Sequence, residues 1–91
     1  GCPEQRGIGK GQGTVLNCPV SGSKKDCREG ILKAFKEQLI PAMESYQPDF
    51  VLISCGFDAH EADSLVGLGL TDEDYREMTL ICIAIAEKYA N

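Results

Sequence analysis

The stretch Phe50-Val51-Leu52-Ile53-Ser54-Cys55-Gly56 decides the fold that the sequence predicts. Residues 50–55 carry no charge and are rich in aromatic and β-branched side chains, with Pro48-Asp49 before them. A short continuous apolar run bounded by turn residues is typical of a strand buried on both faces, as in a parallel sheet. We therefore expect a buried strand over 50–55.

A second strand and a helix are expected upstream of this run. Residues 14–18 (Thr-Val-Leu-Asn-Cys) read as a short strand, which the following proline stops. A helix should begin near Asp26 as its N-cap, because apolar residues then recur at three- and four-residue spacing. Pro41 lacks a backbone donor, so we expect a kink or break there, and an end near Tyr46.

A last helix is expected after residue 70. Thr71 can cap it, and Asp74 stands where a capping box usually has Glu. The order of elements is then strand, helix, strand, helix, which predicts an α/β fold with a parallel-sheet segment and a right-handed crossover.

Composition limits the classes of partner. The chain has 91 residues and a formal net charge of -5, without a basic cluster, so direct nucleic-acid contact is not expected. Its apolar runs are too short to span a bilayer, so no membrane contact is expected either. Five cysteines, an odd number without C-x-x-C spacing, argue against a structural zinc site and favour a reducing intracellular compartment, which we take as the cytoplasm.

The loop over 56–70 holds the candidate functional residues. Asp58 follows the expected strand end by a few residues, which is where ligands bind in open parallel sheets, and a carboxylate there can bind a divalent cation. His60, Glu61 and Asp63 are close in sequence. The alternative is purely structural: acidic residues often fix a loop by local hydrogen bonds, and a lone histidine is more often hydrogen-bonded or exposed than a ligand.

Residues 54–65, S-C-G-F-D-A-H-E-A-D-S-L, resemble the S-A-G-F-D-A-H-x-x-D-P-L signature of zinc-dependent deacetylases. Residues 9–19 are similar to the glycine-rich lead into an N-x-P strand in the same family, the histone deacetylases and acetylpolyamine amidohydrolases. The resemblance covers nearly the whole chain. It implies the arginase–deacetylase fold, with residues 1–91 as a partial, C-terminal histone-deacetylase-like domain.

The resemblance also implies roles for individual residues. Asp58 would be one of three zinc ligands, the other two coming from an upstream D-x-H motif. Further residues would line the substrate channel or support the loop: Gly56, Phe57 and Leu65 for the channel, and His60 and Asp63 for the loop. Two of these keep an alternative: Leu65 is equally well an apolar anchor, and Gly56 a glycine that ends a strand.

The implied activity is zinc-dependent hydrolysis of N-acetyl amides of lysine or polyamines. The upstream D-x-H motif, the tandem histidine pair and the downstream tyrosine segment of the family are missing from these residues, so we assign no catalytic residue. We expect zinc to bind weakly or not at all, and the chain to be inactive alone. The alternatives are a non-catalytic, homo-oligomeric binding or structural module, favoured by exposed sheet edges, and an arginase-type metal hydrolase, which the G-F-D-A-H wording disfavours.

Overall fold

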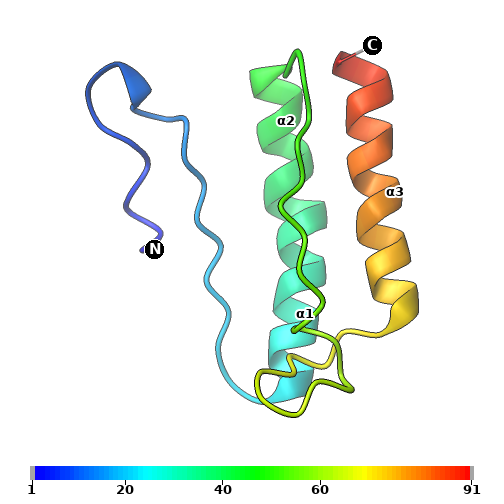
Figure 1. Ribbon diagram of the computed structural model, residues 1–91. Coiled ribbons are helices and arrows are strands. Elements are labelled where there is room, and N and C mark those ends of the chain that lie inside the picture. The colour runs from blue at the N-terminus through cyan, green and yellow to red at the C-terminus, as the bar shows by residue number, and fades with distance from the viewer. Residues whose placement is uncertain (1, 91) are drawn as a thin grey trace.

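Two helical rods that run in the same direction form the body of the molecule (Figure 1). The structure is a computed structural model and describes residues 2–90. One rod is continuous over α1 (Lys24–Ala34), η2 (Phe35–Leu39) and α2 (Ile40–Tyr46); the other is α3 (Asp72–Tyr89), and a single turn, η1 (Gly9–Gly11), precedes both. Within the described residues, no helix has the length and apolar character needed to cross a membrane.

Capping boxes start both rods. In α1, Ser23 Oγ accepts from the Asp26 amide at 3.1 Å, and the Asp26 carboxylate accepts from the Ser23 amide at 3.1 Å. The N-cap is therefore Ser23 and not Asp26, which lies inside the first turn. In α3, Thr71 and Asp74 exchange the same pair of bonds, at 3.2 and 2.9 Å, as the sequence predicted. Each box satisfies backbone donors that a helix start leaves without partners.

The first rod passes through Pro41 without breaking. A π-helical turn, η2, lies just before the proline, with the Ile40 amide donating to the Phe35 carbonyl. Because Pro41 has no N–H, the hydrogen-bond register must shift near it, and a widened turn absorbs that shift inside a continuous helix. The predicted break is wrong, because the helix continues through Pro41, and a π-helical turn precedes the proline instead. The predicted end at Tyr46 is confirmed, with Gln47 in the left-handed conformation as the C-cap.

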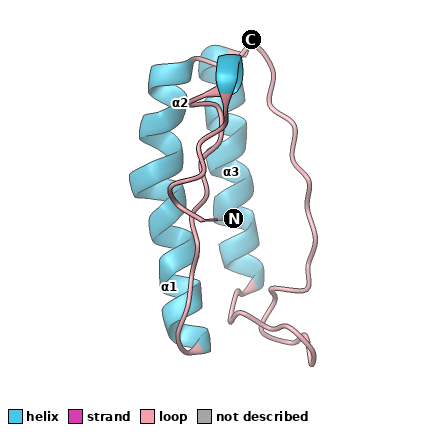
Figure 2. Ribbon diagram, turned by 90° about the vertical axis from the view of Figure 1, so that its left-hand side faces the viewer, coloured by secondary structure: helices cyan, strands magenta, loops and turns pink. Residues whose placement is uncertain are grey.

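The predicted strands do not form. Over residues 2–90, segments 14–18 and 50–55 carry no ladder of backbone hydrogen bonds, and the sole β-type pairing is the isolated bridge between His60 and Leu70. Both segments run along the helices as irregular chain (Figure 1, Figure 2). The predicted α/β parallel-sheet segment, strand-helix-strand-helix, is therefore wrong, and the described residues contain no sheet of the arginase–deacetylase fold. A strand needs a neighbour that pairs its backbone, and a doubly buried strand needs cover on both faces.

The core is small for a chain of this length. Cys27, Leu70 and Ile85 are the buried apolar residues of the described part. The accessible area is 6739 Å², against about 5,200 Å² for a folded monomer of this mass. The radius of gyration is 14.1 Å, against about 12 Å for a compact domain. The excess area includes apolar side chains of the expected strand, with Phe50 77% and Leu52 87% exposed.

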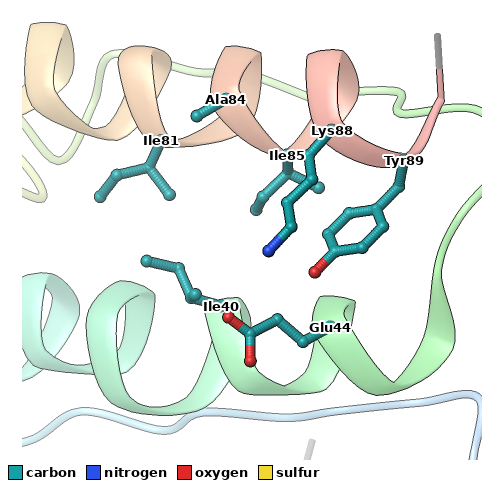
Figure 3. A pocket seen from close by; sticks show the side chains of 7 residues that line it. All are labelled: Ile40, Glu44, Ile81, Ala84, Ile85, Lys88 and Tyr89. Atoms are coloured by element: carbon teal, nitrogen blue, oxygen red, sulfur yellow. The ribbon is translucent and has the colours of Figure 1, made fainter.

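The upper halves of the two rods meet through aliphatic side chains. Figure 3 shows Ile40 of α2 pointing toward Ile81 and Ile85 of α3. Glu44 on α2 and two residues of α3, Lys88 and Tyr89, rim a cavity of about 150 Å³ beside this contact. Apolar packing therefore joins the rods at this end, whereas a polar contact joins them at the other.

Candidate functional site

The loop over 56–70 lies at the end of the molecule where both rods begin (Figure 1). The sequence predicted a loop here, and it contains no helix or strand. Its two arms are held together by backbone hydrogen bonds: Gly67 to the Asp58 carbonyl at 3.0 Å, Leu68 and Leu70 to the Ala59 carbonyl at 3.0 and 3.2 Å, and Glu61 to the Leu70 carbonyl at 2.7 Å. The position of Asp58 is therefore fixed by the far arm of its own loop.

Gly67 lets the far arm of the loop pass close to the Asp63 carbonyl. Its φ of +48° lies in the left-handed region. A Cβ added there would lie 2.7 Å from the Asp63 carbonyl oxygen and 3.0 Å from Lys24 Nζ. A larger residue would therefore clash with the backbone of its own loop at Asp63, whereas the flexible Lys24 side chain could move aside.

Asp63 organises the tip of the loop. Its Oδ1 accepts hydrogen bonds from the Leu65 amide at 2.9 Å and the Val66 amide at 2.8 Å. These two bonds, first that from Val66 and then that from Leu65, hold the pKa of Asp63 below its ordinary value. An aspartate bonded in this way fixes a turn.

His60 uses both ring nitrogens inside the protein. The Ala62 amide donates to Nδ1 at 3.0 Å, so Nδ1 carries no proton. Nε2 lies 2.8 Å from Asp72 Oδ1 and, in the neutral ring, donates its proton there. The side chain ties the loop to the first turn of α3. Because the lone pair of Nδ1 accepts from the Ala62 amide and Nε2 carries the proton, His60 is not a metal ligand in this arrangement.

Tyr75 underlies the start of the loop and was missed as a site residue by the sequence analysis. Its hydroxyl donates to the Gly56 carbonyl at 3.3 Å, and its ring lies 5.1 Å from that of Phe57 and 6.2 Å from that of His60, between centroids. Burial raises the pKa of Tyr75, with smaller contributions from Cys55 and Asp58. The sequence does hold one signal for Tyr75: it lies about one turn into the expected helix that follows the loop.

The carboxylate of Asp58 is not used in the local structure. Asp58 is exposed, and no described residue donates a hydrogen bond or forms an ion pair with its side chain. Within residues 2–90 no three His, Cys, Asp or Glu residues come together in a way that could hold a metal ion. Catalytic zinc takes three protein ligands and accepts carboxylate oxygen as one of them. The residues described here thus fit one position of a zinc site and do not build the whole of it.

The residues expected at the substrate channel differ in their surroundings: one lines a cavity, and the side chains of the other two are exposed to solvent. Gly56 lines a cavity of about 280 Å³ between the loop and the rods, together with Cys55 and Tyr75. The side chains of Phe57 and Leu65 are 68% and 94% exposed. Leu65 therefore anchors nothing within the described chain, and its apolar surface is open to solvent.

Comparison with known proteins agrees with the signature around Asp58. The family described as "Histone deacetylase domain" matches residues 1–91. A "Probable deacetylase" of Archaeoglobus fulgidus is 36% identical over 91 residues, which are 100% of this chain and 25% of that protein. "Histone deacetylase 14, chloroplastic" of Arabidopsis thaliana is 39% identical over 69 residues, 76% of this chain and 16% of that protein. "Histone deacetylase clr3" of Schizosaccharomyces pombe is 34% identical over 87 residues, 96% of this chain and 12% of that protein.

The chain spans a quarter or less of the length of these relatives. No solved structure matches it. Because the family matches from the first residue to the last, the resemblance carried by residues 54–65 is confirmed, and the chain belongs to the histone deacetylase family.

Proposed function

We propose that this chain supplies the metal-ligand loop of a zinc-dependent deacetylase, with Asp58 as the zinc ligand. The observation that carries the proposal is a carboxylate unpaired within residues 2–90, that of Asp58, at the aspartate position of the family signature over residues 54–65. The Asp63 carboxylate accepts hydrogen bonds from the Leu65 and Val66 amides. The Asp72 carboxylate is hydrogen-bonded to His60. The carboxylates of Asp58 and Glu61 are exposed and have no partner among the described residues, on a loop whose backbone is held on both arms. Of these two, only Asp58 holds the aspartate position of the signature. A carboxylate that is fixed in place yet unused is suited to a cation.

The activity we propose for the complete protein is hydrolysis of N-acetyl amides of lysine or polyamines. The names of the relatives, which include deacetylases and a "Histone deacetylase-like amidohydrolase", support this reaction class. Exposed apolar surface at Phe57 and Leu65 is compatible with contact to an acyl-lysine chain, and Gly56 leaves the backbone accessible beside them. The second and third zinc ligands, the general base and the oxyanion donor would come from other parts of such an enzyme. When bound, zinc would activate a water molecule.

Alone, the chain should lack deacetylase activity, because one carboxylate holds zinc weakly. Its five cysteines are all free thiols. The odd number of cysteines and the lack of C-x-x-C spacing are the reasons why we propose a reducing compartment such as the cytoplasm.

The test is a chimera. The segment of the Archaeoglobus fulgidus relative that aligns with this chain is replaced by residues 1–91, and hydrolysis of an acetyl-lysine peptide and of an acetylated polyamine is measured. We expect activity on at least one of them, and more than about a 100-fold loss in D58N. D49N is the matched control, since Asp49 is also an exposed aspartate and lies outside the loop. A D58N chimera as active as its parent, with the same zinc content, would refute the proposal.

One observation favours the alternative, a non-catalytic oligomeric module derived from a deacetylase domain. The chain exposes more surface than a compact monomer of its size, including the apolar residues Phe50 and Leu52. If the chimera folds and is inactive even with Asp58 intact, while the chain alone forms a stable oligomer, this alternative is preferred.

A further inference from the structure

The outer face of α3 is a second surface with a pattern of its own, independent of the loop. We define it by the exposed residues on the side of α3 opposite the buried Ile85: Arg76, Leu80, Ile83 and Glu87. Each is exposed, and Leu80 and Ile83 keep 47% and 46% of their surface in contact with solvent. Figure 1 shows α3 at one edge of the molecule, with the other rod and segment 48–56 on its opposite side. No described residue covers this face.

The outer face of α3 is symmetric in sequence. Its residues form two pairs, each equally distant from the midpoint between Ile81 and Cys82: Arg76 with Glu87, and Leu80 with Ile83. Within the face, positions 76, 80, 83 and 87 have the alternating four- and three-residue spacing of a helix–helix seam. The two central positions are aliphatic and the two outer positions carry opposite charges.

We propose that the outer face of α3 binds a second copy of this chain, with the two helices antiparallel about a twofold axis. In that arrangement, Leu80 packs against Ile83 of the second copy, and Arg76 faces Glu87 of the second copy. The twofold axis repeats both contacts, as an isologous interface requires. An apolar centre flanked by charged residues is the usual anatomy of a protein interface.

Charge complementarity is what selects a second copy as the partner. Arg76 lies only 4.0 Å from Glu73 at the closest atoms, a loose contact that leaves the Arg76 side chain 69% exposed and available. On this face the basic residue, Arg76, is near the start of α3 and the acidic residue, Glu87, is near its end. Opposite charges therefore meet only when the two helices are antiparallel. In the parallel direction, like charges would lie opposite each other.

The association should be weak and reversible. One helix face buries less surface than a standard stable interface, and exposed ion pairs contribute little and are screened by salt. Sedimentation equilibrium of the 91-residue chain over a range of about 10 µM to 1 mM should therefore show a monomer–dimer equilibrium. The dissociation constant should rise with ionic strength.

Complementary charge reversals test the contact itself. In an R76E dimer, Glu87 of each copy would face an acidic side chain at position 76 of the other copy, at both ends of the contact. In an E87R dimer, Arg76 of each copy would face a basic side chain at position 87 in the same way. We expect each single variant to dimerise at least about 10-fold more weakly. An equimolar mixture of R76E and E87R should associate again, because every charge then meets its opposite at both ends. K33E is the matched control: it reverses a charge on the exposed Lys33 of α1 and should leave the equilibrium unchanged.

Each contrary outcome overturns the proposal. A chain that stays monomeric throughout the range has no second copy on this face, which would then be open to another partner. Single variants that associate as strongly as the unmodified chain show that a different surface, such as the exposed apolar residues of segment 50–53, makes the contact. A mixture that stays monomeric, with helical content unchanged by circular dichroism, rules out the antiparallel register.

Discussion

Arg28 and Asp74 join the two helical rods by a two-point ion pair. Arg28 Nε lies 2.6 Å from Asp74 Oδ2, and Nη2 lies 2.9 Å from Oδ1. The Asp74 side chain is buried, and the same carboxylate accepts from the Thr71 amide in the capping box of α3. One aspartate thus starts α3 and ties it to α1. Since Leu70 precedes Thr71 and pairs with Ala59, this contact also positions the loop that carries the candidate ligand.

Removing the Arg28 side chain should destabilise the fold. In R28A the carboxylate of Asp74 stays buried and loses its cationic partner, which we expect to cost about 2 kcal/mol of unfolding free energy, reduced from a fully buried pair because Arg28 is partly exposed. Urea denaturation followed by circular dichroism measures this. R6A is the control, as Arg6 is exposed and makes no ion pair within the described residues. Equal stability of R28A and R6A would contradict a structural role for the pair.

Acid should remove the same stabilisation. The bond from Arg28 is the main cause that lowers the pKa of Asp74 from 3.8 to about 2. A pKa depressed in the folded state contributes stability that is complete above the unfolded value and is lost as the pH falls through the folded value. The contribution is about 2 kcal/mol, lost progressively between about pH 5 and pH 1. The unfolding free energies of the unmodified chain and D74N should therefore differ at pH 7, approach each other near pH 2 and converge at about pH 1. A difference that stays constant over this range would contradict the assignment.

Local signals in the sequence predicted the helix starts well. A capping box needs a side chain and an amide three residues apart, so Thr71 and Asp74 could be identified without knowledge of the rest of the fold. The first helix was placed at Asp26 instead of Ser23, because both residue types can cap and only the backbone decides between them.

The strands could not be predicted with the same security. The composition of residues 50–55 favours burial and an extended backbone. A strand forms, however, only when another segment pairs with its backbone. Within residues 2–90 no such partner is present. The contact of Arg28 with Asp74 was equally out of reach, because the two residues lie 46 positions apart and neither carries a local motif for the other. The sequence did predict a loop at Asp58, since turn residues and the family signature are both local.

His60 should control the opening of the loop. H60F keeps an aromatic ring against Tyr75 but removes the bonds to Ala62 and Asp72. With each bond contributing about 1 kcal/mol, amide exchange over residues 56–70 should become about 10-fold faster or more. Hydrogen exchange followed by mass spectrometry measures this, with the exposed Glu61 in E61Q as the control. Unchanged exchange in H60F would mean that the backbone bonds alone hold the loop.

A zinc titration of the chain distinguishes a single ligand, Asp58, from a complete zinc site. Because no cluster of three donors forms around Asp58 in the described residues, we expect no saturable binding at micromolar zinc in isothermal titration. The free thiols can bind zinc on their own, so the informative quantity is the difference between the unmodified chain and D58N. At millimolar zinc, a weak component should be lost in D58N and kept in D49N. Tight one-to-one binding that D58N abolishes would contradict this expectation and show that the chain gathers further ligands itself, from its own residues or from a second copy.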